Sequence, residues 1–188
     1  MATQTTHATI NGMDTARMFE TVSHIQSDPT LARFEFRNSN RWIQGGHNRS
    51  TIQGFYGAGR EDDSRVEPFV VESGEPPILL GGNEGANPVE FLLHALAACV
   101  TSTVAIHAAA RGITIHEMST EIEGEVDLRG LLGLDEAVPA ACREIRLQIH
   151  VEADCTDEEL DDLLAFVQTH SPVATTISQP VPLVFSRA

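Results

Sequence analysis

The chain has 188 residues, and its composition of 41% hydrophobic and 21% charged residues is typical of a globular protein that buries a core. It carries 27 acidic and 12 basic side chains, which gives a formal net charge of −15. Nucleic acids and anionic membranes attract clustered lysine and arginine, so this charge excludes both as expected partners. The 3 cysteines lack paired spacing and predict reduced thiols in the cytoplasm.

The N-terminal part of the chain is expected to be an arm. Residues 1–11 are polar and lack the apolar core of a signal peptide. Residues 14–25 place apolar side chains at the helical period, and Asp28-Pro29 ends that predicted helix. We therefore divide the chain into an arm with a short helix, residues 1–31, and one domain, residues 32–188.

Short strands are predicted between the arm and the centre of the chain. Apolar residues around Trp42 and around Phe55 follow a strand-like pattern, interrupted by Gly45-Gly46. A polar connection over residues 57–66 leads to a further apolar segment at 68–71.

A long helix over residues 88–110 follows. Asn87 suits the N-cap, Glu90 stands at the capping-box position, and Arg111-Gly112 is a typical helix end. The apolar residues cover nearly the whole circumference, which predicts burial on all sides. The charged Glu90 and two histidines favour a core helix over a membrane span. Since one modest domain rarely hides such a helix, a dimer is expected to cover it.

The second half of the chain predicts strands, one amphipathic helix and a last strand. The helix begins at the capping box Thr156 to Glu159 and ends at Ser171-Pro172. The predicted strands cover residues 113–115, 119–128, 145–151 and 181–185, with a loop over 130–139. Antiparallel strands grouped around two helices indicate an α+β fold rather than a doubly wound sheet.

Cys99 is the candidate reactive residue. It lies in the middle of the long helix, among alanines that leave space around its sulfur. A thiolate is the nucleophilic form, and a neighbouring donor or cation favours it. Thr103, one turn later, is a candidate for orienting the sulfur, and Arg37, Arg41 and Arg49 are candidate cations. The alternative is an unreactive packed cysteine. No metal-binding, phosphate-loop or serine-hydrolase motif accompanies it.

The residues around Cys99 resemble a known family. Asn87-Pro88-Val89-Glu90-Phe91-Leu92-Leu93, followed by Ala97-Ala98-Cys99 and Thr103, is similar to the OsmC/Ohr family of osmotically inducible and organic hydroperoxide resistance proteins. Residues 79–85 and 108–113 resemble its larger, OsmC-like branch. The resemblance implies an intertwined homodimer in which antiparallel sheets wrap around central buried helices. It also implies thiol-dependent reduction of hydroperoxides in oxidative or osmotic stress.

The resemblance assigns roles to individual positions. Cys99 matches the peroxidatic cysteine, whereas the family's second cysteine, just before a proline, falls at Ser171. The family glutamate, ten residues before the cysteine, falls at Val89, so Glu90 is either a catalytic residue or only the capping partner of Asn87. Arg41 or Arg49 is nearest to the family arginine.

Three functions follow as hypotheses. The first is a one-cysteine hydroperoxide reductase that uses Cys99 and an external thiol, without a bound cofactor or metal. The second is a non-catalytic homodimer that binds a small apolar or stress-related ligand in its interface pocket. In the third, Cys99 marks ancestry only and the protein acts through a partner.

Overall fold

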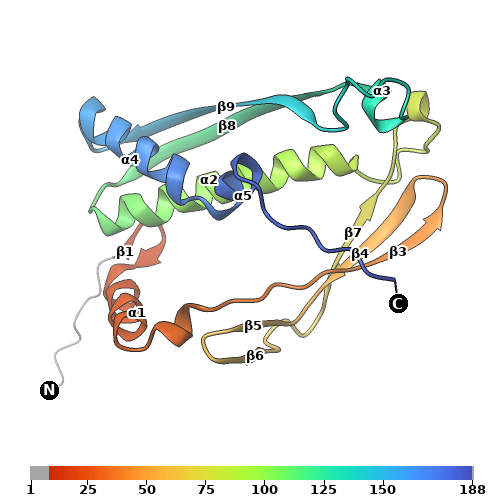
Figure 1. The fold of residues 1–188 in the computed structure, drawn as a ribbon. Coiled ribbons are helices and arrows are strands. Elements are labelled where there is room, and N and C mark those ends of the chain that lie inside the picture. The colour runs from red at the N-terminus through yellow and green to blue at the C-terminus, as the bar shows by residue number, and fades with distance from the viewer. Residues whose placement is uncertain (1–8, 188) are drawn as a thin grey trace, which may run out of the picture. The chain divides into compact units, whose positions relative to one another are not determined.

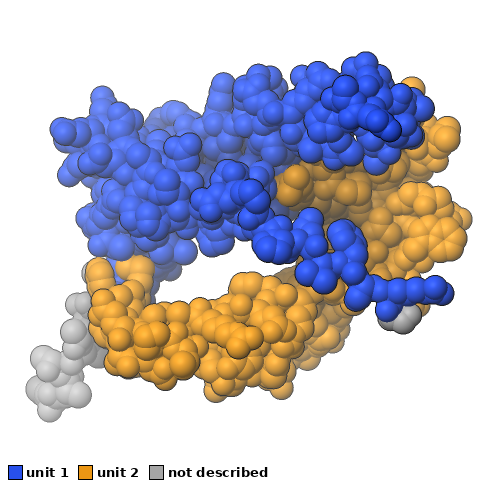
Figure 2. All heavy atoms as spheres, viewed as in Figure 1, with its two compact units in different colours: residues 1–15, 93–188 blue, residues 16–92 orange. Residues whose placement is uncertain are grey.

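The computed structural model describes residues 9–187. The chain folds as two compact units, which we describe separately (Figure 2). Unit 1 comprises the chain up to Thr15 and from Leu93 onward, and unit 2 comprises Ala16–Leu92.

Unit 2 contains small antiparallel sheets. One sheet has the order β3 (Ser39–Gln44), β4 (His47–Ile52) and β7 (Phe69–Ser73), and a separate hairpin pairs β5 (Phe55–Gly57) with β6 (Arg60–Asp62). The β3–β4 turn lies at Gly45-Gly46, as predicted, and Gly45 has a φ of 52° that suits glycine. The polar connection expected at 57–66 was partly wrong, because β6 forms within it. Unit 2 also contains two 3-10 turns, η1 (Pro29–Ala32) and η2 (Pro77–Leu79).

The first described residues form a hairpin within unit 1, and the Asn11 side chain bonds it to the chain around Ile113. Strands β1 (Thr9–Ile10) and β2 (Met13–Asp14) form a short hairpin around Asn11 and Gly12, both with positive φ. The Asn11 amide donates to the Ile113 carbonyl at 3.0 Å and accepts from the Ile115 N–H at 2.8 Å. Helix α1 (Thr15–Ser27) then confirms the predicted short helix.

A long two-stranded ribbon is the main β element of unit 1. Strands β8 (Ile115–Val126) and β9 (Cys142–Ala153) pair antiparallel, with Ile122 opposite Leu147 (Figure 1). The two strands predicted at 113–115 and 119–128 are one strand, because the interrupted pattern marks a register shift after Ile115. A short helix, α3 (Leu128–Leu131), lies in the loop between the strands.

Helix α2 (Pro88–Ala110) has the predicted ends. The Asn87 side chain accepts from the Val89 N–H at 2.8 Å, and Glu90 accepts from the Asn87 N–H at 2.7 Å. Two orphan donors of the first turn are thereby satisfied. The helix stops at Gly112, whose φ of 76° is left-handed.

Helix α2 is not buried on all sides within this chain. One face is buried by residues at four-residue spacing, namely Leu96, Val100, Val104 and Ala108. On the rest of the helix, Leu92 and Ile106 are 40% and 42% exposed. By length and composition alone, α2 is the one helix among residues 9–187 that could cross a membrane, a test that core helices of soluble proteins also pass.

The core of unit 1 joins α2, the ribbon and α4 (Asp157–His170). Leu163 and Val167 of α4 are 0% and 2% exposed and pack in one cluster with the buried face of α2 and the apolar side of the ribbon. The predicted capping box of α4 is present, since Thr156 and Glu159 bond reciprocally. Helix α5 (Pro172–Ser178) follows.

The last strand predicted at 181–185 is not formed. The chain after Gln179 has no regular structure, and Leu183, Val184 and Phe185 are 80–92% exposed. Pro180 and Pro182 remove two backbone donors there, which weakens any strand ladder.

Candidate active site around Cys99

Cys99 lies at mid-length of α2 and is half-buried. Its neighbours Leu96 and Val100 turn into the core of unit 1, so the sulfur lies at the border of the buried face. Its thiol is free, as are those of Cys142 and Cys155.

Ser171 hydrogen-bonds to the Cys99 sulfur. It is fully buried at the junction of α4 and α5, where Pro172 prevents α4 from continuing. Its N–H donates to the Val167 carbonyl at 2.9 Å, which fixes the junction. Its hydroxyl Oγ donates to Cys99 Sγ at 3.2 Å. This hydroxyl therefore places a hydrogen-bond donor directly at the sulfur.

Thr103 contributes to the helix backbone at this point. Its hydroxyl donates to the Cys99 carbonyl oxygen at 2.7 Å and not to the sulfur. Thr103 is itself buried. Thr103 can therefore influence the sulfur only by fixing the backbone of this helical turn.

The other predicted site residues, Glu90, Arg41 and Arg49, belong to unit 2, and we give their contacts within that unit. Glu90 is the capping partner of Asn87. The Arg49 guanidinium donates to Glu72 at 2.6 Å, and His47 lies 2.9 Å from the same carboxylate. These hydrogen bonds, from His47 and then from Arg49, hold the pKa of Glu72 below its usual value.

The remaining candidate arginines, Arg41 and Arg37, also lie in unit 2. Arg41 is opposite Arg49 in the β3–β4 register. Arg37 forms a forked pair with Glu61 at 2.8 and 2.9 Å. A catalytic role for Glu90, Arg41 or Arg49 stays a prediction.

The two other cysteines have structural surroundings. Cys142 begins β9 opposite Val126, and Cys155 packs against the core of unit 1. Burial, followed by the carboxylates of Glu159, Asp157 and Asp154, raises the pKa of the Cys155 thiol, which makes it a poor nucleophile at neutral pH. Within residues 9–187, no group of three or more His, Cys, Asp or Glu side chains is arranged to hold a metal ion.

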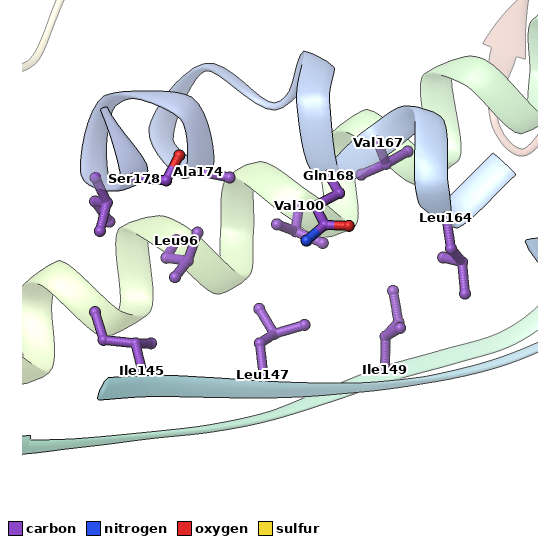
Figure 3. Close-up of a pocket in the computed structure, with 11 residues that line it drawn as sticks. Leu96, Val100, Ile145, Leu147, Ile149, Leu164, Val167, Gln168, Ala174 and Ser178 are labelled. Atoms are coloured by element: carbon purple, nitrogen blue, oxygen red, sulfur yellow. The ribbon is translucent and has the colours of Figure 1, made fainter. Parts of the chain in front are cut away.

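An apolar pocket of about 520 Å³ lies beside this site, inside unit 1. Leu96 and Val100 of α2 face Leu147 and Ile149 of β9 across it (Figure 3). The other lining residues come from β9, α4 and α5: Ile145, Leu164, Val167, Gln168, Ala174, Ile177 and Ser178. Every lining side chain is uncharged.

Comparison with known families matches residues 81–186 to the model of the OsmC-like protein family. The chain belongs to the OsmC-like protein family. The match contains α2 with Cys99, the ribbon, α4 and Ser171. The membership that the sequence predicted is thereby confirmed.

Solved structures share the OsmC-like fold. An OsmC-like protein from Mycoplasma pneumoniae aligns with a TM-score of 0.60 and 19% identity, over 77% of this chain and 87% of that chain. An OsmC-like protein of unknown function from Vibrio cholerae aligns with a TM-score of 0.57 and 11% identity, over 76% and 92%. These likenesses confirm the α+β fold class. No curated protein matches the sequence.

The OsmC-like chain also has features that sequence reasoning missed. The contact between Ser171 and Cys99 joins positions 72 residues apart, which motif spacing cannot reveal. A ring cluster of Phe166, His107 and His170 lies at the end of α4. The four-residue spacing of Phe166 and His170 was the one available signal for it.

Proposed function

We propose that this OsmC-like protein reduces hydroperoxides with Cys99 as the only reacting cysteine. The supporting observation is the buried Ser171 hydroxyl, which donates to the Cys99 sulfur at 3.2 Å. Position 171 thus supplies a hydrogen-bond donor at the sulfur and no second sulfur. Family membership supports the same reaction class.

The first half of the reaction oxidises Cys99. The thiolate sulfur attacks the terminal oxygen of the hydroperoxide, and the O–O bond breaks. Cys99 becomes a sulfenic acid, and the peroxide is reduced by two electrons to an alkoxide. The alkoxide takes up a proton and leaves as an alcohol. Ser171 donates to the sulfur before the attack and to the sulfenate group after it.

The second half needs an external thiol. Ser171 cannot form a disulfide, and Cys142 and Cys155 are free. A small thiol attacks the sulfenic sulfur, water leaves, and a mixed disulfide forms. A second thiol molecule attacks the mixed disulfide, which releases Cys99 as a free thiol and joins the two small thiols in a disulfide. Two thiol hydrogens are consumed for each hydroperoxide reduced.

Consumption of cumene hydroperoxide in the presence of a small thiol tests the proposal. We expect the protein to remove peroxide catalytically, whereas Cys99→Ser removes none beyond the rate without protein. Intact mass after one equivalent of peroxide should increase by one oxygen, located at Cys99. Equal rates for the protein and for Cys99→Ser would refute the proposed reaction.

Ligand binding is the second candidate function, and the apolar pocket favours it. Nine aliphatic side chains line a space of about 520 Å³, and the polar residues there are the uncharged Gln168 and Ser178. This function predicts that an uncharged apolar compound raises the melting temperature, while mild peroxide leaves Cys99 unmodified. If several such probes leave the melting temperature unchanged, this candidate is wrong.

Both functions are proposed for a homodimer in the cytoplasm without a bound cofactor. The net charge of −15 argues against nucleic acid or an anionic membrane as partner.

A further inference from the structure

The end of α4 carries a stacked cluster that lies next to Ser171 in the sequence. The ring of Phe166 stacks on His170 with centroids 3.6 Å apart and planes at 7°. From α2, the His107 ring meets Phe166 edge-on at 4.7 Å, and the Arg111 guanidinium lies over the same ring at 5.3 Å. Phe166 thus connects the two helices.

His170 also closes the last turn of α4. Its Nδ1 lies 2.8 Å from the Phe166 carbonyl oxygen, and a proton on that nitrogen would be donated to it. The Thr169 hydroxyl donates to the same carbonyl oxygen at 3.0 Å and lies 2.9 Å from the His170 Nδ1. His170 therefore supports this turn through its ring and through its nitrogen, one residue before the fully buried Ser171.

These contacts form a closed path. Starting from α2, it runs from His107 to Phe166, to His170, to Ser171 and back to α2 at Cys99. Each step is a recorded ring contact, a hydrogen bond or a peptide link. The hydroxyl of Ser171 can keep its 3.2 Å contact with the sulfur only while the end of α4 keeps its place.

We propose that His170 is a positioning residue for Cys99. Through Phe166 and the last turn of α4 it holds the Ser171 hydroxyl on the Cys99 sulfur, and so it sets the reactivity of that thiol. This inference rests on the proposed function for its biological meaning. Its test needs no peroxide, because it measures the thiol itself.

The experiment is a double-mutant cycle on the alkylation rate of Cys99 by iodoacetamide at neutral pH. Peptide mass spectrometry follows Cys99 separately from Cys142 and Cys155. Ser171→Ala should slow the reaction by about threefold to tenfold, because one hydrogen bond to the sulfur is lost. His170→Ala should slow it by a similar factor. In the Ser171→Ala background, His170→Ala should have no further effect.

Conservative variants separate positioning from general structure. His170→Phe keeps a stacked ring and should retain most of the rate. His150→Ala is the matched control, since this exposed histidine lies on β9, where it pairs with Glu152 at 3.5 Å. It should leave the rate unchanged. Should His170→Ala fail to fold, His170→Asn takes its place in the cycle.

Two results would overturn the inference: no slowing by the His170 variant, or the same slowing with and without the Ser171 hydroxyl. Failure of the proposed function would give a different combination of results. A chain that shows the coupling but consumes no peroxide refutes the peroxidase proposal alone. A chain that consumes peroxide without the coupling refutes the positioning role alone.

Discussion

At the residue scale, the fate of oxidised Cys99 depends on the atom at position 171. Ser171 Oγ lies 3.2 Å from the Cys99 sulfur, and a disulfide needs a sulfur–sulfur distance of about 2.0 Å. We expect Ser171→Cys to form a disulfide with Cys99 after peroxide treatment, seen as a loss of two hydrogens in intact mass. Thr169→Cys, two residues earlier and exposed, should not. A Ser171→Cys chain that stops at the sulfenic acid would contradict this geometry.

Glu90 gives a second prediction at this scale, since it accepts from the Asn87 N–H at 2.7 Å. Glutamine also serves in a capping box, so Glu90→Gln should keep both stability and peroxide reduction. Glu90→Ala should lower the free energy of unfolding by about 1 kcal/mol with unchanged peroxide reduction. Urea denaturation and the peroxide assay measure the two effects. Loss of turnover in both variants would instead assign Glu90 a catalytic role.

The site residues differ in how far sequence could predict them. The roles of Asn87 and Glu90 depend on local spacing, and both were predicted. Thr103 was a candidate for orienting the sulfur, and in the helix its hydroxyl is bonded to the carbonyl four residues earlier. Ser171 was placed by family resemblance, while its contact with Cys99 depends on tertiary packing.

At the scale of elements, the α2–α4 contact should respond to pH through His107. Burial, followed by the charges of Arg111 and His170, holds its pKa below the ordinary 6.5. The unfolded chain therefore binds this proton at higher pH than the folded chain. The contribution of neutral His107 is present above pH 6.5 and is lost as pH falls through the folded pKa.

His107→Gln should remove this part of the pH dependence. Urea denaturation at a series of pH values should show a smaller loss of stability on acidification for His107→Gln than for the natural chain. His150→Gln is the control, because His150 is exposed on β9. Parallel curves for all three proteins would contradict the assigned cause.

Element prediction succeeded where pattern and end signals agreed. Both capped helices were predicted, because a capping box marks each start and glycine or proline marks each end. The strand at 181–185 was wrong, because alternation alone ignored the two prolines. Helix α5 was missed, since its seven residues, Pro172–Ser178, are too few to show a helical period.

At the scale of the whole molecule, the uncovered apolar residues of α2 lead to a prediction about assembly. Ile106 is 42% exposed on a helix whose other face is buried. We expect a homodimer by light scattering during size-exclusion chromatography, and a shift toward monomer in Ile106→Glu. Leu131→Glu, at a 68% exposed position of α3, should remain dimeric. A monomeric natural chain at micromolar concentration would contradict the expected assembly.

The fold class was predictable from sequence, but the burial of α2 was not. An apolar circumference indicates that a helix avoids water without saying which molecule covers it. The single chain buries the stripe through Leu96, Val100 and Val104. Sequence reasoning assigned the rest to a partner, and the assembly experiment tests that assignment.

The β8–β9 ribbon leaves the outer backbone edge of each strand without a paired strand in the described chain. Open edges recruit strands from other molecules unless charge keeps those molecules apart. Glu123 and Glu125 on the exposed side of β8 pair with Arg146 and Arg143, so the net charge of −15 provides the repulsion between chains. High salt screens this repulsion, so storage in concentrated salt should promote ordered aggregation that begins at this ribbon.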